Sequence, residues 1–175
     1  MEQLLIFVVG LVLGSTINVI VSRFGNLQTF LTGRSVCDHC GRHLVAWQLI
    51  PIVGFVLQKG RCRFCSKVIP WRYSVVELVT GLVAVVLYQW LTLEYVLSIL
   101  FFSVFMVISL IDIDTLAIPD PLVALSAAIA AGTMVVAGSD PRAIVFGVLA
   151  GLAIPALFVL PTRGKIMGIG DIKLG

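Results

Sequence analysis

Five long apolar segments, separated by shorter polar stretches, limit the folds that are open to this chain of 175 residues. The segments cover residues 4–22, 75–93, 95–111, 121–137 and 143–160. Each approaches the length of about 20 residues that an α-helix needs to cross the hydrocarbon core of a bilayer. Because 59% of the residues are hydrophobic and 12% are charged, a soluble domain of this size could not bury the apolar surface. The sequence therefore predicts an all-α polytopic membrane protein, built as a helical transmembrane bundle.

The basic residues are distributed unevenly between the predicted loops. The loop at 23–73 holds eight of the twelve Lys and Arg residues, and the segment after residue 160 holds three more. Only Arg142 falls on the opposite side of the predicted membrane. Because cytoplasmic loops carry an excess of Lys and Arg, both basic regions are predicted to be cytoplasmic. If the apolar segments cross the membrane in turn, residues 112–120 also lie on the cytoplasmic side.

Two Cys-x-x-Cys pairs lie in the large basic loop. They are Cys37 with Cys40 and Cys62 with Cys65, separated by a gap of 21 residues. Such pairs are typical of a zinc ribbon, in which four thiolates surround one tetrahedral ion. Disulfides seldom persist in the cytoplasm, so the predicted location favours a metal over two disulfides. The alternative is a set of four free or redox-active cysteines.

The predicted zinc ion has a structural role. Four cysteine ligands leave no coordination position for water, which a catalytic zinc would keep. The loop of roughly 50 residues also has too few apolar residues to form a hydrophobic core without a bound metal ion to stabilise it. His39 and His43 could replace a cysteine ligand, but exposed loop histidines are the simpler interpretation. The sequence thus predicts a small cytoplasmic zinc-ribbon-like loop domain.

Two aspartates lie at the ends of apolar segments. Asp112 follows the third segment, and Asp171 ends the sequence Gly168-Ile-Gly-Asp171. A carboxylate at a bilayer boundary is costly to place and is therefore a candidate for function. Two carboxyl groups that face each other can hydrolyse an amide, because the ionised one activates water while the protonated one polarises the scissile carbonyl.

Other roles are open for the aspartates of this region. Asp114, Asp120 and Asp140 are interpreted as helix caps, headgroup contacts or ion-pair partners. Asp120, which lies between Pro119 and Pro121, is predicted to be the N-cap of the fourth segment.

Taken in order, these motifs resemble the type IV prepilin leader peptidases, membrane aspartyl proteases of the Gly-x-Gly-Asp type. The matching stretches are Gly10-Leu-Val-Leu-Gly-Ser-Thr-Ile-Asn-Val19, the two Cys pairs, Arg72-Tyr73 with Val76-Glu77, Ile111-Asp112 with Ile118-Pro-Asp120, and Gly168-Ile-Gly-Asp-Ile-Lys-Leu174. The resemblance extends over nearly the whole chain. Members of the family continue into further spans beyond the position of Gly175, so we expect this chain to be a C-terminally truncated member.

The resemblance implies that Asp112 and Asp171 are the catalytic pair, with Asp114 as the reserve candidate. It implies removal of the short basic leader of prepilins or pseudopilins, after a glycine, at the cytoplasmic face of a bacterial inner membrane. It also implies N-methylation of the new amino terminus with S-adenosylmethionine as methyl donor. Glu77 is a candidate for orienting the substrate amine, or for capping its helix. The expected partners are these substrates and the bilayer, and no nucleic acid.

The predicted organisation has three parts: a retained transmembrane span at 1–22, the four-cysteine zinc loop at 23–73, and a transmembrane aspartyl peptidase core at 74–175. Two alternative functions stay open. The first is a protease of another Gly-x-Gly-Asp branch that cuts other substrates in the bilayer, although its members are not expected to carry a zinc loop. The second is a non-enzymatic, zinc-bearing membrane scaffold whose aspartates are caps and ion-pair partners.

Overall fold

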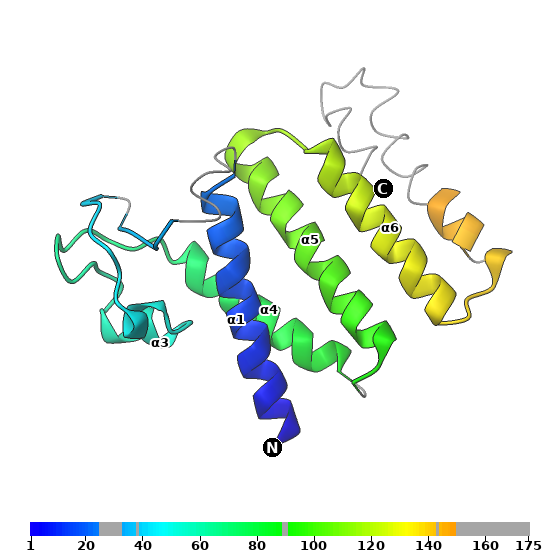
Figure 1. Cartoon of the computed structure of the whole chain (residues 1–175), viewed down its shortest axis with the longest axis horizontal. Helices are drawn as coiled ribbons and strands as arrows, with labels where there is room; N and C mark the ends of the chain where they lie inside the picture. The colour runs from blue at the N-terminus through cyan, green and yellow to red at the C-terminus, as the bar shows by residue number, and fades with distance from the viewer. Residues whose placement is uncertain (25–32, 38, 89–90, 143, 150–175) are drawn as a thin grey trace. The chain divides into compact units, whose positions relative to one another are not determined.

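The computed structural model describes residues 1–24, 33–37, 39–88, 91–142 and 144–149 (Figure 1). These residues are mostly helical, and none of those described forms a strand longer than an isolated bridge. The chain divides into two compact units, Met1–Leu91 and Thr92–Gly175. The helical class predicted from the apolar segments is confirmed for the part of the chain that the structure describes.

The first unit is built around a pair of packed helices, α1 (Glu2–Ser22) and α4 (Arg72–Leu87), which Figure 1 draws in blue and green. The chain between them carries the four cysteines and two short helical elements. These elements are the 3₁₀ turn η1 (Ala46–Leu49) and the helix α3 (Val53–Leu57), which contact each other. The first unit thus combines a helix pair with the Cys-bearing loop.

Glycines bring the backbones of α1 and α4 into close contact. A Cβ atom added to Gly10 would lie 2.8 Å from the Cα of Gly81, and one added to Gly14 would lie 2.6 Å from the Cα of Glu77. Small residues four positions apart let membrane helices approach each other in this way. Gly14 therefore fixes how close the segment of α4 that carries Glu77 lies to α1.

The second unit contains α5 (Leu93–Thr115) and α6 (Asp120–Val136), which pack side by side. The side chain of Thr92 caps α5 by accepting a hydrogen bond of 3.2 Å from the N–H of Tyr95. The helix ends at Leu116, whose φ of 52° is left-handed and whose N–H donates to the carbonyl of Asp112 at 2.7 Å. Ile108 and Ile111 are fully buried and form the centre of this unit.

The beginning of α6 corrects one prediction. Asp120 is the first residue inside the helix, and the N-cap is Pro119. The carbonyl of Pro119 accepts hydrogen bonds from the N–H groups of Leu122 and Val123, so the helix begins one residue earlier than predicted. Asp120 therefore lies in the first turn of α6, where a carboxylate interacts favourably with the helix dipole.

Two of the helices, α1 with 21 residues and α5 with 23, are long and apolar enough to span a membrane. The α6 helix matches the predicted segment 121–137 to within one residue, and with 17 residues it is shorter than α1 and α5. The predicted segment 75–93 differs more, because α4 ends at Leu87, where Tyr88 takes up an extended conformation. Most of the fifth predicted segment lies outside the described residues. The complete transmembrane bundle and the three-part organisation stay predictions.

Candidate functional site

The two Cys-x-x-Cys pairs form two copies of the same turn. In the first copy the N–H of Cys37 donates to the carbonyl of Arg42, and in the second the N–H of Cys62 donates to the carbonyl of Lys67, at 3.0 and 2.8 Å. An antiparallel bridge closes each copy, Val36 with His43 and Arg61 with Val68. The chain therefore folds each pair into a knuckle that points both sulfurs the same way.

A left-handed residue ends each knuckle. Gly41, with φ of 66°, donates its N–H to the carbonyl of Cys37, and Ser66, with φ of 59°, donates in the same way to the carbonyl of Cys62. Glycine adopts this conformation without steric cost, whereas serine does so only where the surroundings require it. The second knuckle is thus the more constrained of the two.

The four sulfur atoms converge on one point. All four Sγ atoms lie within 4.8 Å of one another, and those of Cys37 and Cys65 are 3.9 Å apart. Four thiolates bound to one tetrahedral ion by bonds of about 2.3 Å lie about 3.8 Å apart, so the observed spacing suits a metal. It is too long for a disulfide, in which the two sulfurs lie about 2.05 Å apart. The cluster can bind a metal ion, and neither described histidine belongs to it.

The two thiols of the second knuckle differ in acidity. Hydrogen bonds from the backbone N–H groups of Cys65 and Phe64 lower the pKa of Cys62 to about 7. The backbone N–H of Lys67 acts in the same direction on Cys65, but burial and the neighbouring sulfurs together raise the pKa of that thiol to about 11. Cys62 is therefore partly ionised near neutral pH, whereas Cys65 stays protonated until it binds a cation.

Cation–π contacts join the two knuckles to each other and the second knuckle to η1. The guanidinium of Arg42, on the first knuckle, lies 5.2 Å from the ring centre of Phe64 on the second. That of Arg63 lies 5.9 Å from the ring of Trp47. Each contact contributes about 0.5–1 kcal/mol at an exposed position. These arginines also place positive charge beside the cluster, which offsets the charge of bound thiolates.

A cavity of about 850 Å³ lies between the Cys-bearing loop and one end of the α1–α4 pair. Its walls come from three parts of the first unit. The α1 helix contributes Ser15 and Asn18, α4 contributes Tyr73 and Glu77, and the loop contributes Gln48, Ile52, Phe55, Cys37 and Cys62 among others. The knuckles thus form part of the cavity wall, so a metal bound there would support the cavity.

Glu77 connects the loop to the helix pair. Its Oε2 accepts a hydrogen bond of 2.8 Å from the backbone N–H of Ile52, and the side chain of Ser15 is a second hydrogen-bond partner. Asn18 makes a further link, because its Nδ2 donates to the carbonyl of Tyr73 at 3.0 Å. Glu77 as a whole residue is only 9% exposed. The second role weighed for Glu77, that of a helix cap, does not fit these bonds, because its side chain binds the loop.

Gln48 organises the loop from inside. This side chain is 8% exposed, donates from Nε2 to Oε1 of Gln58 at 2.8 Å, and accepts at its own Oε1 from the N–H of Val45 at 3.0 Å. Close packing adds to the constraint, because a Cβ atom on Gly54 would collide with the carbonyl of Gln48. Asn18, Gln48 and Ile52 were not predicted as site residues from their sequence context; the Gly10-x-x-x-Gly14 spacing indicates that this part of α1 packs closely.

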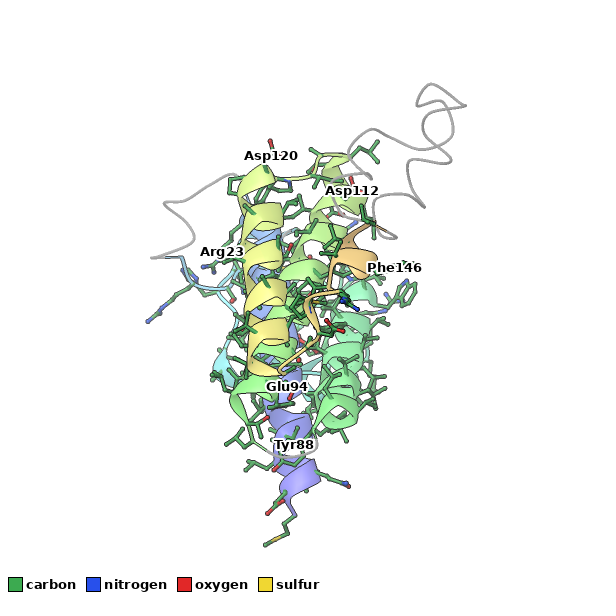
Figure 2. All side chains as sticks on the ribbon, turned by 90° about the vertical axis from the view of Figure 1, so that its right-hand side faces the viewer. Arg23, Tyr88, Glu94, Asp112, Asp120 and Phe146 are labelled. Carbon is green, nitrogen blue, oxygen red and sulfur yellow. The ribbon has the colours of Figure 1, made fainter. Side chains whose placement is uncertain are left out.

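The predicted catalytic aspartates belong to the second half of the chain. Asp112 is half-buried in the last turn of α5, and Asp114, two residues further along the helix, is exposed. Figure 2 shows Asp112 and Asp120 at the same end of the α5–α6 pair. Asp171 and the Gly168-Ile-Gly-Asp171 segment lie outside the described residues. The pairing of the two aspartates therefore stays a prediction.

Comparison with known proteins places the chain in a family. The family model of the bacterial peptidase A24 N-terminal domain matches residues 8–92, which include most of α1, both knuckles and α4. A prepilin leader peptidase/N-methyltransferase of Bacillus subtilis (strain 168) is 31% identical over 173 residues, covering 97% of this chain and 69% of that relative. The chain belongs to the prepilin leader peptidase/N-methyltransferase family.

Further members of the prepilin leader peptidase/N-methyltransferase family show how much of the relatives this chain spans. The protein of Myxococcus xanthus (strain DK1622) is 36% identical over 118 residues, covering 65% of the chain and 35% of the relative. That of Aeromonas salmonicida (strain A449) is 29% identical over 145 residues, covering 67% and 50%. No solved structure gives a significant match. Family membership identifies this chain as a member of an enzyme family. The two long apolar helices, together with that membership, indicate that it is located in a membrane.

Proposed function

We propose that the protein is a membrane aspartyl endopeptidase that removes the short basic leader of type IV prepilins or pseudopilins and then methylates the new amino terminus. The observation that carries this proposal is the match over 97% of the chain to a relative whose name states both activities. The proposed catalytic pair is Asp112 with Asp171. Cleavage takes place on the cytoplasmic side of the membrane, where eleven of the twelve basic residues are predicted to lie.

The position of Asp112 supports its role as a catalytic carboxyl group. It lies in the last turn of a 23-residue apolar helix, directly after the buried Ile111, and is half-buried itself. A carboxyl group at this boundary is within reach of water while its surroundings are of low polarity. Asp114 is exposed and lies two residues further along, so it faces a different direction around the helix axis.

The chemistry requires two carboxyl groups with different protonation. The ionised carboxylate takes a proton from water as the water attacks the scissile carbonyl. The protonated carboxyl group polarises that carbonyl and later gives a proton to the leaving amine. The pair titrates as a unit, so the two roles are assigned to the pair rather than to either residue.

The four-cysteine cluster is proposed to hold a structural zinc ion. Sulfur is the ligand type that zinc favours in closed tetrahedral sites, and four thiolates leave no position for a reacting water. The matched turns of the two knuckles and the sulfur spacing support this assignment. A metal in this place would hold the wall of the cavity formed by Cys37 and Cys62.

The methylation half of the proposal requires a methyl donor. S-adenosylmethionine supplies a methyl group on a positively charged sulfur, which the free amine of the processed pilin accepts. The protein must therefore bind a nucleoside of net positive charge beside a peptide amino terminus. The chain's residues contribute binding, orientation and exclusion of water.

The peptidase activity is tested with the protein in lipid nanodiscs and a prepilin that carries its basic leader. Leader removal is followed by mass spectrometry for wild type, Asp112→Asn, Asp171→Asn and Asp114→Asn. We expect the first two variants to lose cleavage by at least about 10³-fold, by analogy with other residues that act directly in acid–base catalysis. Asp114→Asn is the matched control, with the same chemical change two residues away, and is expected to cleave at the wild-type rate.

The same assay separates the alternatives. Full activity of Asp112→Asn with loss in Asp114→Asn would move the catalytic role to Asp114. A wild-type protein that cuts other membrane substrates but no prepilin would identify another Gly-x-Gly-Asp protease. Absence of all cleavage, with a folded chain and a filled metal site, would support the zinc-bearing scaffold.

A further inference from the structure

The cavity in the first unit contains a buried carboxylate with no cationic partner. Glu77 is 9% exposed and lines this cavity of about 850 Å³. Its partners are neutral donors, the backbone N–H of Ile52 and the side chain of Ser15. Arg23, Arg34 and Lys67 also line this cavity, but no basic side chain is among the described groups that act on the Glu77 carboxylate. Buried carboxylates are normally paired with a positive charge, so the Glu77 carboxylate is open to a cationic group of a ligand.

We propose that this cavity is the binding site of the methyl donor, with the Glu77 carboxylate facing the positive charge of that ligand. The inference rests on the methyltransferase half of the proposed function and adds the place and chemistry of the binding site. Its ligand class is a sulfonium nucleoside, which carries one positive charge more than the thioether that remains after methyl transfer.

The size of the cavity fits such a ligand. Pockets for small molecules and cofactors have volumes of about 300–1,000 Å³ and combine apolar walls with a few polar groups. A cavity of about 850 Å³ is larger than an ammonium group alone would need, and it suits a nucleoside joined to an amino acid. This comparison favours the whole methyl donor over the amino terminus of the pilin as the occupant.

The lining also supplies the other groups that the ligand requires. Apolar and aromatic surface comes from Ile52, Phe55 and Tyr73, against which a base can lie. Hydroxyl and amide groups come from Ser15 and Gln48. They are held on rigid supports, because Gln48 is fixed by Gln58 and Ser15 belongs to the helix that packs against α4. Polar groups fixed in this way can bind a ribose or an adenine edge with little reorganisation.

The test measures binding in the absence of peptide. S-adenosylmethionine and its thioether product, S-adenosylhomocysteine, are titrated by calorimetry into the protein in nanodiscs. We expect wild type to bind both and Glu77→Gln to bind S-adenosylmethionine about tenfold or more weakly, since loss of one charge-assisted contact typically has this effect. Binding of the thioether is expected to fall less, because it lacks the sulfonium charge.

Two further variants guard against a misfolded protein. Glu77→Gln keeps an oxygen that can accept from the Ile52 N–H, and Glu2→Gln makes the same chemical change at an exposed carboxylate of the same unit. Ser22→Trp instead adds bulk at an exposed residue of the cavity wall without altering Glu77. We expect Ser22→Trp to weaken binding of both nucleosides, Glu2→Gln to change neither, and the metal content of all variants to equal that of wild type.

Equal S-adenosylmethionine affinity in wild type, Glu77→Gln and Ser22→Trp would overturn the inference, because the donor would then bind elsewhere. The proposed function would be unaffected by that result. A wild-type protein that neither binds the donor nor methylates processed pilin would overturn both the inference and the methyltransferase half of the proposed function. Leader cleavage, measured on the same preparation, reports the peptidase half separately.

Discussion

The carboxylate of Glu77 on α4 accepts a hydrogen bond of 2.8 Å from the backbone N–H of Ile52 in the loop that follows η1. Ile52 has φ of 61° and ψ of −49°, close to a γ-turn with positive φ, a conformation that β-branched residues rarely adopt. The N–H of Val53 bonds back to the carbonyl of Pro51 around this turn, at 2.6 Å. Strained residues persist where the surroundings fix them, and they cluster at functional sites. Here the strained turn forms part of the cavity wall.

Substitution of Gly14 is expected to disrupt the α1–α4 pair. A Cβ at this position would lie 2.6 Å from the Cα of Glu77, so in Gly14→Ala the helix backbones must move apart. Overpacking of this kind typically costs about 1–3 kcal/mol. The measurement is thermal unfolding in detergent. Gly132→Ala is the control, because nothing lies within 4 Å of a Cβ there and alanine favours the helix by about 1 kcal/mol. Equal unfolding temperatures for the two variants would contradict the described packing.

Gln48→Leu is expected to loosen the Cys-bearing loop. The substitution leaves the Gln58 side chain and the Val45 N–H without their partner at a position that is 8% exposed. An unsatisfied buried group costs about 1–3 kcal/mol. The variant should therefore release metal to a chelator faster than wild type, as followed with a chromogenic indicator. Gln3→Leu, at an exposed position of α1, should release it at the wild-type rate; identical rates for all three proteins would exclude the role given to Gln48.

Metal binding is expected to depend on pH in two stages. The pKa of Cys65 is raised to about 11, so that thiol loses its proton when the metal binds at any pH below this value. Cys62, with its pKa lowered to about 7, adds a second released proton only below about pH 7. Affinity should thus fall as pH falls, and more steeply below pH 7. Competition with a chelator between pH 6 and 8, about one unit either side of the Cys62 pKa, measures this slope. A slope that is the same on both sides of pH 7 would argue against the difference between the two thiols.

Removal of the metal is expected to weaken binding of the methyl donor. Cys37 and Cys62 line the cavity, so loss of the ion frees part of its wall. The matched proteins are wild type, wild type treated with chelator, and Cys62→Ser. Calorimetry with S-adenosylmethionine should show weaker binding in the last two, and restored zinc should rescue only the treated wild type. Unchanged affinity for S-adenosylmethionine in the metal-free protein would show that the bound metal does not support the cavity.

The features predicted from the sequence are those that depend on local patterns. The apolar segments predicted α1, α5 and α6 because a long apolar run needs no partner to be identified as a helix. The spacing of Cys37, Cys40, Cys62 and Cys65 predicted one cluster, because two Cys-x-x-Cys pairs at this separation typically supply the four ligands of one metal ion.

Other features depend on contacts between distant parts of the chain. The bond between Glu77 and Ile52 spans 25 residues, and no local pattern indicates that an isoleucine has a positive φ. The start of α6 at Asp120 depends on which carbonyl accepts the first hydrogen bond, which sequence alone decides only to within a residue or two. The pairing of Asp112 with Asp171 rests on the family resemblance.

The central claim is that one chain carries two separable activities, leader cleavage through Asp112 and methylation through Glu77. The most direct test is the mass of the pilin product made by wild type, Asp112→Asn and Glu77→Gln, each given intact prepilin and, separately, pilin with its leader already removed. We predict that Asp112→Asn leaves the leader on prepilin but methylates the pre-cleaved pilin. Glu77→Gln is predicted to remove the leader and leave the new amino terminus unmethylated. Loss of both activities in both folded variants, or of neither, would contradict the account.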